Sequence, residues 1–117
     1  MTIEMYVYAW PAVQPYGSRH NVFCRNLRLA VRDKLLHGEL AGKDMRSEWC
    51  KVVVTMYAKG KQRPHPPYTD FRDSVMAALI DANITNDKGN VTSLDIRVAD
   101  GPDVYAGGTI VRVEYDG

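Results

Sequence analysis

The sequence contains few cysteines and histidines and no long apolar run, which excludes several classes of protein. Among its 117 residues there are two cysteines and three histidines, without the close ligand spacing of a zinc site. We therefore expect Cys24 and Cys50 to be reduced, partly buried thiols. The apolar runs are only a few residues long, and no charged-then-apolar segment precedes the first predicted strand. These features predict neither a membrane span nor a signal peptide, and they favour a cytoplasmic location.

Common catalytic motifs are also absent. The sequence has no glycine-rich phosphate loop, no metalloprotease helix motif and no nucleophile elbow. The three histidines are scattered along the chain, at His20, His37 and His65. A cysteine nucleophile assisted by one of these histidines is an open alternative, but core packing is the favoured interpretation of both cysteines.

The charges are almost balanced overall but unevenly distributed. Fifteen Lys and Arg residues oppose fourteen Asp and Glu residues, for a net charge of +1. Residues 1–63 carry eleven basic and five acidic residues, whereas residues 64–117 carry four and nine. The basic half can lie along phosphates while carboxylates of the other half hold a cation, although contact between the two halves explains the division equally well.

Four segments have the residue pattern of β-strands. Residues 2–9 alternate between apolar and polar side chains, and residues 49–57 are rich in β-branched residues, which is typical of a buried strand. Residues 94–98 and 111–115 alternate again, with glycine-rich turn sequences between them. We expect these last two strands to form an antiparallel hairpin.

Two further segments predict helices. The first begins near Asn21, and its polar face carries three basic residues, Arg25, Arg28 and Arg32. The second begins at Thr69 or Asp70 and runs to Ala82, and Asn83 suits the left-handed position that ends a helix. Residues 1–117 are therefore expected to form a single α/β (α+β) domain of β-α-β-α-β-β order, a mixed sheet with two helices.

A basic, proline-rich loop is predicted between the second strand and the second helix. It carries three cations, Lys59, Lys61 and Arg63, followed by three prolines within residues 64–67. Prolines exclude regular structure and the cations resist burial, so the loop must be exposed. We expect these cations to contact phosphates, although a solvated surface loop has the same composition.

Three aspartates, Asp70, Asp73 and Asp87, form the best candidate for a metal site, because carboxylate oxygens suit a hard cation such as Mg²⁺. Each also has an ordinary structural interpretation. Asp70 is a good helix N-cap, Asp73 has the spacing of a capping box, and Asp87 lies in a polar turn sequence. Spacing alone does not separate these alternatives.

The order of these features resembles that of a known family. Trp10-Pro11 follows the first predicted strand, the basic loop precedes Asp70, and Asn86-Asp87-Lys88-Gly89-Asn90-Val91 precedes the third strand. This arrangement is similar to the RusA family of Holliday junction resolvases, which are small dimeric Mg²⁺-dependent endonucleases of bacteria and phages. The resemblance implies a RusA-like fold, with Asp70 matching one aspartate of the motif that opens the helix. It also implies that Asp87 matches the first aspartate of the later acidic pair.

The sequence departs from the family pattern beside both aspartates. Lys88 stands where the family has the second aspartate of the pair, and Asp73 falls where a family lysine is expected. Residues 69–72 do not reproduce the D-x-D-N pattern of the family. A cation in place of an acidic ligand weakens Mg²⁺ binding, since like charges repel strongly at such distances.

The resemblance implies a homodimeric endonuclease that cleaves branched DNA in recombination or repair, in a bacterial or phage-infected cell. Mg²⁺ would bind Asp70, Asp73 and Asp87, with Lys88 as a cation that stabilises the transition state. Phosphates would contact the basic residues of the loop and of the first helix, namely Lys59, Lys61, Arg63, Arg25, Arg28 and Arg32. The alternative is a non-catalytic relative, an accessory or inhibitor protein that binds nucleic acid or a protein partner. A third possibility is an oligomerising structural protein without a ligand.

Overall fold

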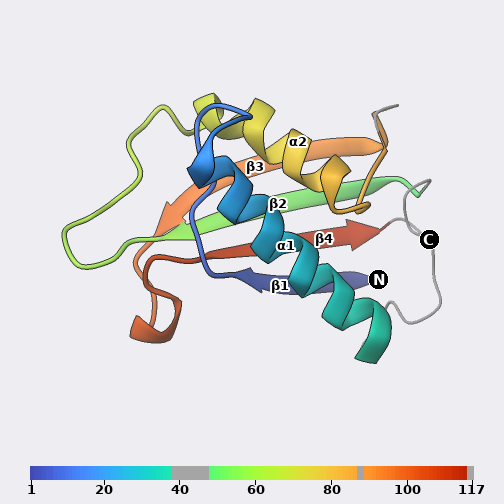
Figure 1. The fold of residues 1–117 in the computed structure, drawn as a ribbon, viewed down its shortest axis with the longest axis horizontal. Helices are drawn as coiled ribbons and strands as arrows, with labels where there is room; N and C mark the ends of the chain where they lie inside the picture. The colour runs from blue at the N-terminus through green and yellow to red at the C-terminus, as the bar shows by residue number, and fades with distance from the viewer. Residues whose placement is uncertain (38–47, 87–88, 116–117) are drawn as a thin grey trace.

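The computed structural model describes residues 1–37, 48–86 and 89–115. Four strands form one mixed sheet, and both α-helices cover the same face of it (Figure 1). The predicted α/β class, with two helices and a mixed sheet, is confirmed. In chain order the elements are β1 (Thr2–Val7), α1 (Ser18–His37), β2 (Cys50–Tyr57), the 3-10 helix η1 (Tyr68–Phe71), α2 (Arg72–Asp81), β3 (Val91–Ala99), the 3-10 helix η2 (Asp103–Tyr105) and β4 (Thr109–Tyr115).

Neither described helix combines the length and the apolar character needed to cross a lipid bilayer.

The strands lie in the order β1-β4-β2-β3. Since β4 is antiparallel to both β1 and β2, and β3 is parallel to β2, the strands β1, β2 and β3 all run in one direction. The crossovers through α1 and α2 both move from the β1 side of the sheet towards β3. Because such crossovers share one handedness, both helices pack on the same face.

The predicted hairpin between the last two strands is wrong. β4 pairs with β1 and β2 and makes no ladder with β3 among the described residues. Its position is central: Val113 faces Ile3 on one side and Val52 on the other, and all three side chains are buried. The connection between Ala99 and Thr109 is also longer than the hairpin loops of about two to five residues. Alternation along a strand indicates which side chains face inward, but it does not identify the neighbouring strand.

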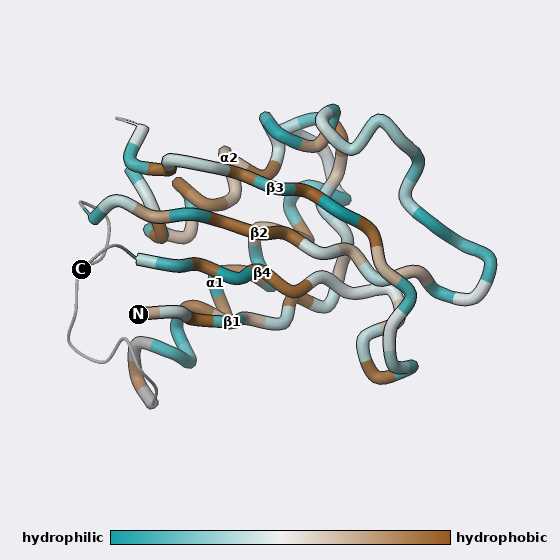
Figure 2. The backbone as a smooth tube through the Cα atoms, turned by 180° about the vertical axis from the view of Figure 1, so that it is seen from behind, coloured by the Kyte–Doolittle hydropathy of each residue, from teal (hydrophilic) through white to brown (hydrophobic). Residues whose placement is uncertain are grey.

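The core lies between the helices and the sheet. Phe23 and Leu27 of α1 and Leu79 of α2 are completely buried against the inward-facing residues of the strands, including Val52 and Val54. Figure 2 shows the opposite face of the sheet, which neither α1 nor α2 covers.

Along β1 and β4, exposed or half-buried side chains on the uncovered face alternate with buried side chains that face the helices, as expected for a sheet with one solvated side. Arg112 of β4 lies within 4.0 Å of Glu4 and 3.9 Å of Glu114 on this face.

Both helices begin differently from the sequence prediction. α1 starts at Ser18 rather than near Asn21, whose backbone N–H already donates to the Gly17 carbonyl at 3.0 Å. The second helical segment opens with η1 and becomes α-helical only at Arg72. The cis peptide between Pro66 and Pro67 lies directly before this turn.

The end of α2 was predicted correctly. Asn83 has the left-handed backbone conformation, with φ of 60°. Its N–H donates to the Ile80 carbonyl, and the N–H of Ile84 donates to the Leu79 carbonyl, both at 3.0 Å. This pair of bonds is a Schellman motif, and the buried Ile84 side chain supplies its hydrophobic contact.

We predict that Asn83→Ala destabilises the domain by about 1 kcal/mol, because alanine keeps the β-carbon that lies close to a carbonyl oxygen in the left-handed conformation and loses the short polar side chain that lets asparagine tolerate it. Asn83→Gly is the control and should change stability little, because glycine adopts this conformation without strain. Urea denaturation measures the free energy of unfolding of both variants. Equal stability of the alanine and glycine variants would contradict the assignment of this helix end.

Candidate nucleic-acid interface

The carboxyl ends of β1, β2 and β3 lie at the same end of the sheet, on the left of Figure 1. We call this end the carboxyl edge of the sheet. Ligand sites of α/β proteins commonly lie beyond this edge, because the connecting loops converge there. Two adjoining hollows of about 430 and 660 Å³ lie at this edge and share Trp10, Arg19 and Gln62 in their walls. We call these hollows together the basic groove.

One wall of the basic groove continues directly from β1 and is held by two side-chain hydrogen bonds. The Trp10 Nε1–H donates to the Tyr57 carbonyl at 2.9 Å, which fixes the orientation of the indole ring. The Thr109 hydroxyl donates to the Ala9 carbonyl at 2.7 Å. The segment that carries Trp10 is therefore tied to β2 and β4, and its position is set before any ligand binds.

A tight turn at the start of the basic loop forms another part of the wall. The backbone N–H groups of Lys59 and Gln62 each donate to the other residue's carbonyl at 2.9 Å. Gly60 permits this turn because it adopts a positive φ of 58°. Lys61 thus stands at the tip of a closed turn, and Lys59 stands at its base.

Three cations of the basic groove have no carboxylate partner in the described part of the chain. Arg19, Lys59 and Lys61 are all exposed and make no ion pair there. Arg63 differs, because its guanidinium donates to the Asp100 carboxylate at 2.8 Å. A hollow lined by unpaired cations attracts anions, and phosphate is the anion that arginine and lysine recognise in nucleic acids.

Aromatic rings lie among these cations. Trp10 is half-buried and lines both hollows, Tyr8 lines the first, and Tyr68 and Phe71 line the second. Tyr8 is the most accessible, at 73% exposed. Proteins that bind single-stranded nucleic acid combine a basic groove with aromatic rings on which bases stack.

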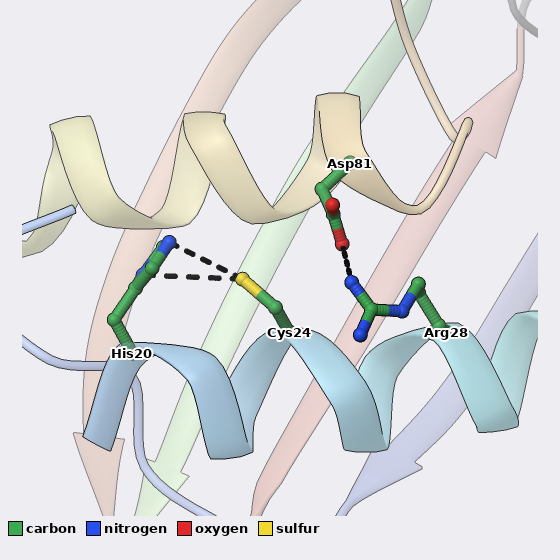
Figure 3. A network of polar contacts seen from close by, with 4 residues as sticks. All are labelled: His20, Cys24, Arg28 and Asp81. Carbon is green, nitrogen blue, oxygen red and sulfur yellow. Dashed lines mark hydrogen bonds and ion pairs between the residues drawn. The ribbon is translucent and has the colours of Figure 1, made fainter. Parts of the chain in front are cut away.

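The three α1 arginines predicted to contact phosphates, Arg25, Arg28 and Arg32, do not line the basic groove. Arg25 and Arg32 are exposed on α1, whereas Arg28 points towards α2 and donates to the Asp81 carboxylate at 2.5 Å (Figure 3). Their predicted phosphate contacts are therefore separate from those of Lys59 and Lys61. Only the loop cations are brought together with Arg19.

A buried polar cluster links α1 and α2 near the Arg28 pair. His20 Nε2 lies 3.3 Å from the Cys24 sulfur, and His20 Nδ1 lies 3.1 Å from the Ser74 hydroxyl (Figure 3 shows the first contact). Burial is the main reason that the pKa of the Cys24 thiol is raised; the Asp81 carboxylate acts in the same direction, and Arg28 opposes it.

A cysteine nucleophile needs a lowered pKa and access to substrate. Cys24 has neither, and Cys50 is also buried and forms no disulfide. Both thiols belong to the core, as the sequence indicated.

The predicted metal ligands are only partly described. Asp70 and Asp73 are exposed, in η1 and in the first turn of α2. Neither η1 nor α2 has a side-chain cap, so the interpretation of Asp70 as an N-cap is wrong, whereas Asp73 does lie near the positive end of the α2 dipole. Asp87 and Lys88 lie outside the described residues.

The fit of this region to Mg²⁺ is incomplete. No three His, Cys, Asp or Glu side chains gather as a metal site in residues 1–37, 48–86 and 89–115. Asp70 and Asp73 supply two carboxylates, a number that Mg²⁺ accepts when waters and substrate phosphates complete its coordination. The third predicted ligand, Asp87, lies outside the described residues.

Asn90 anchors the segment that follows α2. Its side-chain oxygen accepts hydrogen bonds from the Thr85 hydroxyl and from the Asn86 N–H, and its Nδ2 donates to the Glu48 carbonyl at 2.6 Å. This buried amide joins the residues before and after the predicted acidic turn to the start of β2. Asn90 thus has a clear structural role.

Comparison with protein-family models and with curated proteins finds no match to this chain. The RusA-like activity therefore stays a prediction.

Sequence reasoning did not identify Arg19, Gln62 or Trp10 as site residues. Arg19 precedes the predicted helix start near Asn21, but it lies in the first turn of α1 and lines the groove. Trp10 directly follows the first predicted strand. Its place directly after a strand and before Pro11 was the available signal, because large aromatic side chains at strand ends can line a ligand site.

Proposed function

We propose that the protein binds branched DNA through the basic groove. The observation that supports this proposal is the arrangement of Arg19, Lys59 and Lys61 around the fixed ring of Trp10. Cations and an aromatic ring in one concave site match the two chemical parts of a nucleic acid, the phosphate and the base.

The cations account for affinity. Arg19, Lys59 and Lys61 need no rearrangement of ion pairs with described carboxylates before they contact phosphates. Neutralisation of phosphates releases condensed counterions, so binding falls steeply as salt increases. Such contacts position the protein on DNA but do not read its sequence.

The aromatic ring accounts for the preference for a branch. Bases inside a continuous duplex are stacked on both sides and present no open face to Trp10. At a branch point bases are more easily unpaired and unstacked, which lowers the cost of placing one against a protein ring. Trp10 and Tyr8, both in the wall of the smaller hollow, provide rings for such a base.

Mg²⁺-dependent cleavage of the bound DNA is the second candidate function and rests on the resemblance to the RusA family. Asp70 supports it by position, because it lies in η1 between Tyr68 and Phe71, two residues that line the basic groove. Without cleavage, the same groove serves an accessory or inhibitor protein that covers a DNA branch.

We predict that the double variant Lys59→Glu with Lys61→Glu binds a four-way DNA junction at least about tenfold more weakly than the wild type at moderate salt, and that its salt slope is smaller by about two. Fluorescence anisotropy over a salt series measures both quantities. The matched control is Arg25→Glu with Arg32→Glu, which makes the same charge change on exposed positions of α1. An equal loss in both variants would assign binding to overall charge instead of the basic groove.

A separate prediction concerns Asp70. If the protein cleaves junctions with Mg²⁺, Asp70→Asn should abolish cleavage, because an amide is a poor ligand for a hard cation. Junction binding should be kept or strengthened, since one negative charge is removed. The melting temperature should not change, because the exposed Asp70 side chain caps no helix. Undiminished cleavage by the variant would remove Asp70 from the metal site.

A further inference from the structure

The outer edge of β3 is unpaired in the described part of the chain, where β3 is the last strand of the sheet. The hydrogen bond from the Ala58 N–H to the Ala99 carbonyl, 3.1 Å long, shows that Ala99 directs its backbone groups towards β2. Backbone groups alternate in direction along a strand, so those of Leu94, Ile96 and Val98 point outward. An unpaired edge of this kind is a template for another strand.

β3 carries one negative and one positive side chain, placed symmetrically on the two sides of Ile96. Asp95 and Arg97 flank Ile96, and both lie on the face of the sheet that α1 and α2 leave uncovered. Their side chains are 66% and 57% exposed and lie 3.4 Å from each other. The charges of residues 95–97 are therefore complementary to those of the same segment running in the opposite direction.

We propose that β3 pairs antiparallel with β3 of a second copy of this chain, about a two-fold axis at Ile96. This pairing joins the two sheets into one continuous sheet with α1 and α2 of both copies on the same face. Each Asp95 then lies opposite Arg97 of the second copy, and this ion pair occurs twice, as the symmetry requires. This surface adjoins the basic groove at Tyr68, which also lines a hollow beside β3, but the inference does not depend on DNA binding.

The backbone supports the same register. With the axis at Ile96, Leu94 lies opposite Val98 of the second copy, and Ile96 lies opposite Ile96. These are the residues whose backbone groups point outward, so they form the hydrogen-bonded pairs of the new ladder. Asp95 and Arg97 fall in the non-hydrogen-bonded pairs, where side chains approach most closely.

Two neighbouring registers also place the outward-pointing backbone groups of the two β3 strands opposite one another, but they are less favourable. Moving the axis by one residue places Asp95 opposite Asp95, or Arg97 opposite Arg97, and like charges directly opposite are destabilising.

A hollow beside β3, on the face of the sheet that the helices cover, can receive apolar side chains of the second copy. It measures about 280 Å³ and is lined by residues of η1, α2 and β3, including Tyr68, Arg72, Leu94 and Ile96. Opposed residues of an antiparallel pair share one face of the sheet. Ile96 and Val98 of the second copy therefore lie on the side of this hollow and can fill it.

Sedimentation velocity of the purified chain tests the proposal. The wild type should be a dimer. Arg97→Asp and Asp95→Arg should each weaken dimerisation at least roughly tenfold, because each variant places like charges opposite one another twice. An equal mixture of the two variants should restore a dimer, since their charges are complementary. The control is Arg112→Asp, which removes a strand arginine beside Glu114 on the central strand β4 and should leave the dimer intact.

A variant that fails to fold would be detected by circular dichroism. In that case the double variant Asp95→Arg with Arg97→Asp, which reverses both charges and keeps them complementary, should dimerise like the wild type. A monomeric wild type would overturn the proposal. Single variants that dimerise normally, or a mixture of them that stays monomeric, would also overturn it.

Discussion

The carbonyl oxygen of Tyr57, the last residue of β2, accepts hydrogen bonds from two different loops. The Trp10 indole N–H donates at 2.9 Å from the segment after β1, and the Gly107 N–H donates at 3.1 Å from the segment before β4. The Tyr57 N–H in turn donates to the Gly108 carbonyl at 2.9 Å. This one residue therefore joins two connections, the segment after β1 and the segment before β4, to the end of β2, and the basic groove depends on their relative positions. A satisfied and partly buried carbonyl is costly to free, so the groove is preorganised.

Local chemistry made much of the fold predictable. The alternation of residues 2–7 and the β-branched residues of β2 require strands, and Asn83 followed by Ile84 specifies the end of α2. The position of β4 was not predictable in this way. Its alternating residues satisfy either an edge or a central position, and only burial of Val111 and Val113 between β1 and β2 decides between them. That choice depends on contacts distant in sequence.

The candidate site was only partly predictable for the same reason. The composition of the basic loop indicated exposed cations, and Lys59 and Lys61 do line a groove. Arg63 and Arg28 look equivalent to them in sequence, but each is paired with a carboxylate far along the chain, Asp100 or Asp81. No local pattern reveals such a partner. Arg19 reaches the groove because α1 begins earlier than its apolar spacing indicated.

The central claim, that DNA occupies the basic groove, is tested most directly by the two tryptophan side chains. Trp10 lines the groove, whereas the exposed Trp49 lies just before β2, at the opposite end of that strand. In ¹⁵N-labelled protein each indole N–H gives its own NMR signal, and Trp49→Phe assigns them. Titration with a four-way junction should shift or broaden the Trp10 signal and leave the Trp49 signal unchanged. A junction that binds and moves only the Trp49 signal, or neither signal, would contradict the account.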